Sequence, residues 1–219
     1  MIMNELTQVK NRIKECKETK NPDLCIEKCG ITDLYELPEL LECNHLKTLS
    51  LSYNQISDIS CLKHLIELES LQLCYNRICN ISCLKNLTKL QNLDLDHNQI
   101  SDINSLEYLT KLDSLSLAHN RIFNISSLTN LKSLTTLDLS YNNIDDYTWL
   151  ENLKGIELLN LRGNRIDFDF LEKMTGLQEL LLDESQFPDY VCLETTDLDE
   201  KISILEEMIG IEFLYINIG

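Results

Sequence analysis

The sequence is poor in glycine, proline and basic residues. Its 219 residues include only six glycines and three prolines, too few for a glycine-rich phosphate loop, a collagen-like segment or long flexible linkers. Against 19 Lys and Arg stand 36 Asp and Glu, a formal net charge of −17. This charge argues against binding to a nucleic-acid backbone or an anionic membrane surface. We therefore expect a protein partner with a basic surface, no direct nucleic-acid contact and no membrane.

Long apolar runs and a disulfide framework are also missing. No window reaches the roughly 18 apolar residues of a membrane span. The N-terminus has a charge by residue 5 and lacks the apolar core of a signal peptide. The nine cysteines are an odd number without framework spacing, which favours free thiols in a reducing compartment. These features predict a cytoplasmic or nuclear protein.

The dominant pattern is a repeat with the spacing L-x-x-L-x-L-x-x-N-x-I-x-x-I-x-x-L-x-x-L. Five consecutive copies keep one constant period and begin at Leu46, Leu68, Leu90, Leu112 and Leu134. A copy shortened by one residue begins at Ile156, a degenerate one begins at Leu177, and another lies upstream of Leu46. About eight repeats therefore cover residues 22–187. Repeats of this length stack into a solenoid.

Each repeat position has a predicted structural task. The two leucines of L-x-L, such as Leu49 and Leu51, point into the core because alternate strand residues face opposite sides. An asparagine recurs where the strand turns, and its amide can satisfy backbone groups of neighbouring turns. Cys29 takes this slot in the first repeat and Ser185 in the last. Asp or Asn four residues later predicts the N-cap of a short helical turn, at Asp33, Asp58, Asn80, Asp102, Asn124 and Asp146.

The two ends of the chain are predicted to close the solenoid. Leu6, Val9, Ile13 and Cys16 have helical spacing, so residues 1–21 should form an amphipathic N-terminal cap helix. Residues 188–219 are predicted as a C-terminal cap, with a helix at about 199–208 and a short apolar strand after it. The whole chain is expected to be one structural domain.

The repeats resemble two branches of the leucine-rich repeat family. The opening repeat with Ile31–Leu34 and the apolar spacing at Ile204, Leu205, Met208, Ile211 and Leu214 are similar to the group around the protein phosphatase 1 regulatory subunit. The sequences from Asn54 to Leu62 and from Asn98 to Leu106 are similar to the repeats of the bacterial surface internalins. We expect the first branch, because internalin-like proteins need export and usually a following immunoglobulin-like domain.

This resemblance implies an α/β fold, namely a right-handed leucine-rich repeat solenoid. A parallel β-sheet lines its concave face, short helical or 3-10 turns lie on the convex side, and a helical cap covers the N-terminus. In the phosphatase regulator, aromatic and acidic residues of the column between the strand leucines contact the partner. Here that column contains Asp94 and Asp138 but no aromatic residue.

Candidate partner-binding residues lie in the columns of the concave face. An aromatic residue precedes each ladder asparagine in five repeats, and adjacent strands would place these residues about 4.7–4.9 Å apart. Such aromatics are favoured binding anchors, although Tyr or His is also common filler at this position. The aromatic candidates are Tyr53, Tyr75, His97, His119 and Tyr141. The polar candidates are Asp94, Asp96, Asp138, Arg162 and Asp183.

Chemical sites are not expected. His97 and His119 could share a metal ion with Asp94 or Asp96, but stacking within the aromatic row explains both histidines without one. No Ser/His/Asp or Cys/His arrangement stands outside the repeat pattern. We therefore predict no metal, no cofactor and no enzymatic activity.

The acidic charge is concentrated in the last third of the chain, where residues 134–219 hold 19 acids and five bases. This region either steers a basic partner or serves solubility. The sequence predicts a protein-binding scaffold or regulatory subunit, monomeric by itself, with a phosphatase-type regulator as one form of it. The alternatives are a structural subunit packed permanently in a large assembly and, third, an exported adhesion module.

Overall fold

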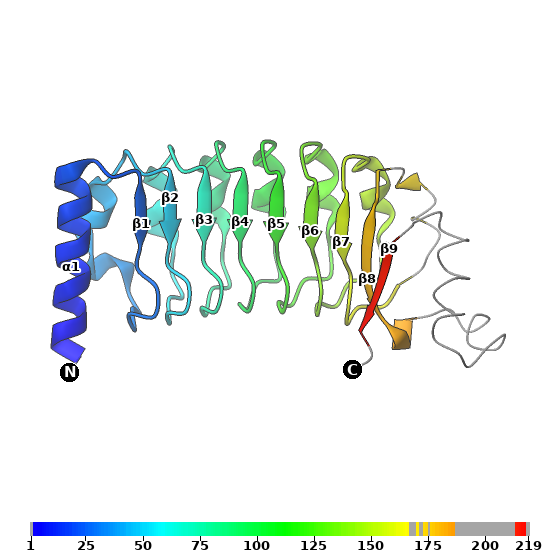
Figure 1. Ribbon diagram of the computed structural model, residues 1–219, viewed down its shortest axis with the longest axis horizontal. Helices are drawn as coiled ribbons and strands as arrows, with labels where there is room; N and C mark the ends of the chain where they lie inside the picture. The colour runs from blue at the N-terminus through cyan, green and yellow to red at the C-terminus, as the bar shows by residue number, and fades with distance from the viewer. Residues whose placement is uncertain (1, 167–169, 171–172, 175, 187–212, 218–219) are drawn as a thin grey trace.

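The computed structural model describes residues 2–166, 170, 173–174, 176–186 and 213–217 (Figure 1). Within these residues, strands β1 to β9 form one sheet in which sequence neighbours pair in chain order. The sheet is open, and Figure 1 shows its strands as a row with the two chain termini at opposite ends. The strands are β1 Asp23–Cys25, β2 Thr48–Ser50, β3 Ser70–Gln72, β4 Asn92–Asp94, β5 Ser114–Ser116, β6 Thr136–Asp138, β7 Leu158–Asn160, β8 Glu179–Asp183 and β9 Phe213–Asn217.

All pairings are parallel, and their register follows the sequence repeat. Leu49 pairs with Leu71, and the same offset of one full repeat continues as far as β7. From β7 to β8 the offset is shorter by one position, because Leu159 pairs with Leu180. These leucines are at most 2% exposed. The predicted leucine rows therefore form the core, and each residue beside them on the strand faces away from it.

An α-helix lies beside the first strand. Helix α1, Ile2–Thr19, packs on β1 and on the 3-10 helix η2, and Figure 1 shows it beside the β1 end of the row. Val9, Ile13 and Cys16 are at most 4% exposed, as the helical spacing predicts. The helical cap is confirmed, and it covers an edge that would otherwise expose apolar side chains and unpaired backbone groups.

Short 3-10 helices connect the strands, as predicted for the convex side, and Figure 1 shows them behind the sheet. They are η1 Leu34–Glu36, η2 Pro38–Glu42, η3 Ser60–His64, η4 Ser82–Asn86, η5 Asn104–Tyr108, η6 Ser126–Asn130, η7 Thr148–Asn152 and η9 Glu184–Gln186.

Five of the six predicted caps lie one residue before the N-cap position. Asp33 is the N-cap of η1, but the N-cap of η3 is Ile59, whose side chain cannot cap. Asp58 lies one residue earlier and accepts a hydrogen bond from the Ser60 backbone N–H at 2.7 Å. The Asx residue thus satisfies a first-turn amide from outside the helix, as an Asx turn.

The asparagine ladder is confirmed in atomic detail. The Asn98 amide donates to the backbone carbonyls of Leu73 and Leu95 at 3.0 Å, and to that of Asp96 at 3.1 Å. Its Oδ1 accepts from the Ile78 N–H at 2.9 Å. One buried side chain therefore bonds four backbone groups of adjacent turns. It is the partner of the Ile78 N–H and the second donor to each of the three carbonyls.

The last ladder position differs from the others. Ser185 occupies the ladder position but is exposed. The amide of Gln186 donates to the carbonyls of Leu161 and Asn164 at 2.8 and 3.0 Å. Ser185 thus ends the asparagine ladder, and the longer side chain of Gln186 makes the bond to the Leu161 carbonyl from the next position. The predicted C-terminal cap helix lies outside the described residues, and β9 is parallel to β8.

Candidate functional site

Five rings form a continuous stack on the concave side, at the C-terminal ends of the strands. The ring centroids of successive members are 4.6, 4.0, 4.0 and 4.3 Å apart, and successive ring planes differ by 9° to 17°. We call this row the aromatic ribbon; its members are Tyr53, Tyr75, His97, His119 and Tyr141. The rings lie closer together than the usual spacing of strands, so they contact each other directly.

The backbone of the ribbon is left-handed. All five residues have φ between 51° and 58°, a region that favours glycine and asparagine and disfavours bulky side chains. The same slot holds Lys28 in the first repeat and Gly163 after Tyr141, both also with positive φ. Backbone geometry therefore does not demand an aromatic residue there, and the row persists despite a local conformational cost.

Different neighbours cover the two ends of the ribbon. The Lys28 ammonium lies 4.8 Å from the centroid of the Tyr53 ring, a cation–π contact. At the other end, a Cβ on Gly163 would lie 2.5 Å from Cδ1 of Tyr141. The missing side chain of Gly163 thus leaves room for the last ring.

The ribbon is accessible to a partner mainly through ring edges. Tyr53, Tyr75 and Tyr141 are 45%, 43% and 40% exposed, although each ring is stacked on at least one neighbour. Because ring faces are occupied by other rings, the exposed parts are edges that carry phenol hydroxyls and imidazole nitrogens. The ribbon presents a long amphipathic edge instead of open faces for stacking.

Three carboxylates lie beside the ribbon, two at the last residues of strands β4 and β6 and one two residues after β4. We call them the floor acids: Asp94, Asp96 and Asp138. Asp94 accepts from the backbone N–H of Asp96 at 3.0 Å. Asp96 accepts from the Ser116 hydroxyl and, at 2.7 Å, from the Ala118 N–H.

The Asp138 carboxylate has a similar environment of neutral donors. It accepts from the N–H and hydroxyl of Ser140 at 2.8 and 2.6 Å, and from the Asn160 amide at 2.7 Å. Among the described residues, no Lys, Arg or His forms an ion pair with any floor acid. Their charge is thus stabilised by neutral donors and remains uncompensated.

Burial changes the protonation of this surface. The pKa of Asp96 is raised to about 6, mainly because burial penalises the charged carboxylate, with repulsion from Asp94 and Asp138 adding to it. Burial also lowers the pKa of His97, and the adjacent His119 lowers it further. Near neutral pH, Asp96 carries a charge that its surroundings stabilise poorly.

The other two polar candidates lie towards the C-terminal end of the sheet. Asp183 accepts from the backbone N–H of Gly163 at 2.8 Å, so this carboxylate has a structural role. Arg162 is half-buried, and its Nε has no hydrogen-bond partner among the described residues. The structure brings Asp94, Asp96 and the two histidines together near the middle of the sheet, while Arg162 and Asp183 lie three to four strands further along.

The stacked histidines are poorly arranged to share a metal. Their ring centroids are 4.0 Å apart and their planes differ by 13°, so the in-plane lone pairs of the two rings run side by side instead of converging. Among the residues that the structure describes, no group of three or more His, Cys, Asp or Glu is placed to hold a metal ion.

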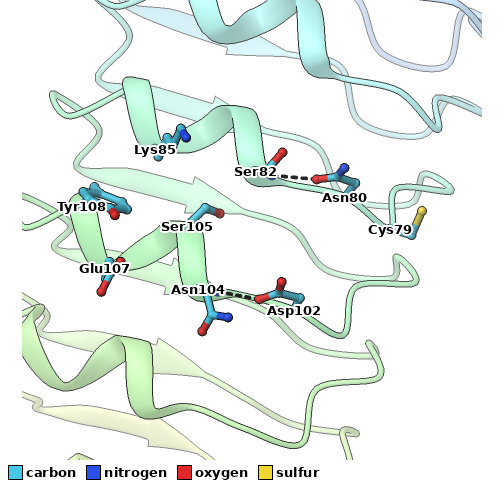
Figure 2. Close-up of a pocket in the computed structure, with 9 residues that line it drawn as sticks. All are labelled: Cys79, Asn80, Ser82, Lys85, Asp102, Asn104, Ser105, Glu107 and Tyr108. Atoms are coloured by element: carbon cyan, nitrogen blue, oxygen red, sulfur yellow. Dashed lines mark hydrogen bonds between the residues drawn. The ribbon is translucent and has the colours of Figure 1, made fainter.

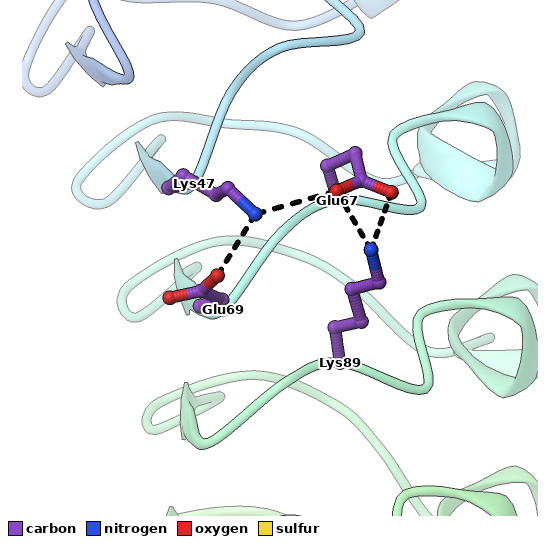
Figure 3. Close-up of polar contacts among 4 residues, drawn as sticks. All are labelled: Lys47, Glu67, Glu69 and Lys89. Atoms are coloured by element: carbon purple, nitrogen blue, oxygen red, sulfur yellow. Dashed lines mark hydrogen bonds and ion pairs between the residues drawn. The ribbon is translucent and has the colours of Figure 1, made fainter.

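At the N-terminal ends of strands β2 to β4, two lysines and two glutamates form a network of ion pairs that the sequence patterns did not reveal (Figure 3). Lys47 contacts Glu67 at 3.3 Å and Glu69 at 2.9 Å, while Lys89 contacts Glu67 at 2.6 Å. The four residues immediately precede strands or their first core leucines. Their alternation of sign from one repeat to the next was the available signal.

The convex side has a shallow, open depression of about 420 Å³ between η4 and η5 (Figure 2). Its lining includes Lys85, Glu107 and the exposed ring of Tyr108. Figure 2 shows that Asn80 and Asp102 face their own turn amides there. This depression is a gap between repeated turns without converging chemical groups.

The fold and the repeats define a leucine-rich repeat solenoid, a class that generally serves protein interaction through its concave surface. Residues 67–122 match the family model "Leucine rich repeat", and residues 44–86 and 110–152 match "Leucine Rich repeats (2 copies)". No curated protein sequence matches the chain. In the described part of the chain, no helix combines the length and apolar character needed to cross a membrane.

Solved structures of two Listeria monocytogenes internalins are similar to this chain. Internalin C2 gives a TM-score of 0.78 at 27% identity, over 95% of this chain and 92% of that chain. Internalin InlF gives 0.69 at 26% identity, over 86% and 54%. The Arabidopsis receptor kinase HAESA, solved with a peptide hormone and a co-receptor, gives 0.56 at 24% identity over 66% and 27% and shares the fold alone. The resemblance to internalins, expected to be the weaker branch, is thus the one these structures support.

Proposed function

We propose that this protein is a non-enzymatic interaction scaffold or regulatory subunit that binds a protein partner on its concave face. The observation that carries this proposal is the aromatic ribbon, in which tyrosines at least 40% exposed recur at a left-handed backbone position that does not require them. Aromatic side chains bury large areas with few rotors, so they are effective anchors. The ribbon and the floor acids supply the contacts, with Arg162 and Asp183 at the far end.

We also propose that the protein is a monomer in the cytoplasm or nucleus and that its partner presents a basic surface. Its formal net charge of −17 disfavours self-association and attracts basic surfaces. We do not extend this role to a protein phosphatase, since the column between the strand leucines contains Asp94 and Asp138 but no aromatic side chain.

The test removes the rings without disturbing the backbone. The triple variant Tyr75→Asn, His97→Asn, His119→Asn keeps a residue that tolerates positive φ at each site. A matched control, Tyr108→Ala, Phe123→Ala, Trp149→Ala, removes three exposed aromatic rings outside the ribbon. Both variants should keep the native circular dichroism spectrum.

The readout is affinity purification with crosslinking from the native cell. The ribbon variant should recover at least about tenfold less partner than the wild type, and the control should recover the wild-type amount. Equal recovery by the ribbon variant and the wild type would refute the concave face as the interface. A complex that resists high salt at fixed stoichiometry, and is lost in the control variant, would indicate a permanent structural subunit instead.

A second candidate is an exported surface module, favoured by the similarity to the internalin structures. The two candidates differ in where the protein is found. Fractionation of the source cells should recover the scaffold inside the cell, whereas recovery from the surface or the medium would favour the exported module.

A further inference from the structure

Among the described residues, the floor acids differ from Glu67 in having no cationic partner. Glu67 is held between the ammonium groups of Lys47 and Lys89 at 3.3 and 2.6 Å (Figure 3). Asp94 and Asp96 have only neutral donors in the described structure, namely backbone N–H groups, the Ser116 hydroxyl and the Cys74 thiol. A partly desolvated carboxylate is most stable when a cation approaches it. The free protein therefore leaves a place for a positive charge beside the ribbon.

The ribbon itself is compatible with cations. At its first slot, the Lys28 ammonium lies 4.8 Å from the Tyr53 ring centroid. The remaining ring faces are covered by stacking, so a partner that must insert a planar group, such as a base or sugar face, finds no free ring surface. Long aliphatic stems that end in a cation suit an edge-presenting ribbon beside carboxylates, because the stem packs on the ring edges while the head reaches the acids.

We propose that the partner contributes a polypeptide segment with Lys or Arg side chains, which lies along the aromatic ribbon and places its cations on Asp94, Asp96 and Asp138. This inference rests on the proposed function and specifies the chemistry of the partner. The five ribbon positions span roughly 19 Å at the usual strand spacing, the length of about six extended residues. A short linear segment is therefore sufficient to occupy the ribbon.

The test uses short synthetic peptides of defined charge and of equal length and apolar content, each long enough to extend past both ends of the ribbon. One carries Lys and Arg, one carries Asp and Glu, and one is neutral. Fluorescence anisotropy measures their binding to the intact chain at low salt. The basic peptide should bind at least about tenfold more tightly than the neutral one, and the acidic peptide should not bind.

A pair of charge-matched variants then locates the binding surface. The floor variant is Asp94→Asn, Asp96→Asn, Asp138→Asn, in which each amide oxygen can still accept hydrogen bonds. The control variant is Asp58→Asn, Asp102→Asn, Asp146→Asn, at the Asx-turn positions. Asparagine already occupies this turn position at Asn80 and Asn124, where it accepts the same backbone hydrogen bond at 2.9 Å.

Both variants change the net charge equally, so general electrostatic attraction is held constant between them. The floor variant should bind the basic peptide about tenfold or more weakly than the wild type, and the control variant less than about twofold more weakly. Equal weakening in the two variants, or no preference of the wild type for the basic peptide, would overturn the inference. Thermal unfolding of each variant should give a cooperative transition, which checks that the fold is intact.

The pH dependence of the affinity for the basic peptide provides an independent test of the inference. The charged and titratable groups that act on Asp96 are Asp94 from its own repeat, Cys74 from the β3 repeat and Asp138 from β6, while His97 interacts with Asp94 and His119. Acidification below about pH 6 neutralises Asp96. Affinity for the basic peptide should therefore fall by at least about fivefold from pH 7.5 to pH 5 in the wild type, and less in the floor variant. A constant or rising affinity would contradict the inference.

These outcomes separate the two proposals. If the basic peptide shows no preference for the floor acids while the ribbon variant still loses the native partner, the concave interface stands and the cationic segment is wrong. If both tests fail, the concave face is not the interface.

Discussion

Two neighbouring columns of the repeat recur for different reasons. The asparagine column, represented by Asn98, is 8% exposed and joins four backbone groups of adjacent turns. The ribbon column, represented by His97 one residue earlier, makes its side-chain contacts mainly with other members of its own column. Recurrence at the first column is required for folding, whereas recurrence at the second builds a surface. Repetition alone therefore does not distinguish structure from function, and hydrogen-bond geometry does.

The strongest test of this contrast removes one member of each column. Asn98→Leu should lower the free energy of unfolding by about 3–5 kcal/mol, because it leaves the buried Ile78 N–H without a partner and removes one of the two donors to each of three carbonyls. His97→Asn should change it by less than about 1 kcal/mol, since lost stacking is offset by a better residue for positive φ. Urea denaturation measures both. Similar losses for the two variants would remove the distinction between the columns.

A second test concerns the floor acid with the raised pKa. Its folded-state pKa of about 6 lies above the ordinary value of 3.8, so the folded protein binds the proton more tightly than the unfolded chain. Stability therefore falls as pH rises from about 4 to about 6 and stays reduced above that range.

Asp96→Asn should accordingly raise the free energy of unfolding at pH 7.5 by about 1–2 kcal/mol, after allowance for solvent screening. The gain should vanish below about pH 4, where the wild-type carboxyl is protonated in both states. Parallel denaturation series at the two pH values measure this. A destabilised variant at pH 7.5 would show that Asp96 belongs with the structural column.

The end of the ribbon allows a smaller, matched comparison. Gly30 and Gly163 have φ of 66° and 67°, but a Cβ would meet nothing within 4 Å at Gly30 and the Tyr141 ring at Gly163. Both changes to alanine should cost about 1 kcal/mol for the left-handed backbone. Gly163→Ala should cost about 0.5–1 kcal/mol more because the last ring must move. Adding Tyr141→Asn should abolish that difference, and its persistence would indicate a cause other than the ring.

The smallest effect on stability is expected for the ion pairs of Glu67 with Lys47 and Lys89. Glu67→Gln removes one carboxylate between Lys47 and Lys89, all three of which are substantially exposed. Thermal unfolding should show only a slight loss of stability that disappears at high salt, because solvent and salt screen exposed ion pairs. A large, salt-resistant loss would mean that this network is structural, and the contrast with the floor acids would weaken.

Much of the fold follows from spacing. The leucine rows, the asparagine ladder and the N-terminal helix are predicted because a fixed period places equivalent residues in identical surroundings. Prediction fails where the period breaks or where geometry within one residue matters. Gln186, one position after the ladder slot, bonds the Leu161 carbonyl because its side chain is longer, and Asp58 accepts from Ser60 one position before the cap.

The candidate surface was predictable in its membership but not in its chemistry. The sequence places the ribbon and the acids in neighbouring columns, since strand alternation is regular. It does not show that ring faces are mutually covered, that Lys47 and Lys89 compensate Glu67, or that Asp94 and Asp96 lack a cationic partner in the part of the chain that the structure describes. Those properties depend on rotamers and on distances between side chains of different repeats.

The most direct test of the central claim is site-specific photo-crosslinking in the native cell. A photoreactive phenylalanine analogue replaces Tyr75 in the ribbon or, as a control, Phe123, which is 63% exposed outside it. The account predicts a discrete protein adduct from the Tyr75 position that is absent from the Phe123 position and is lost when His97 and His119 are changed to asparagine. No adduct at Tyr75, or the same adduct from both positions, would contradict it.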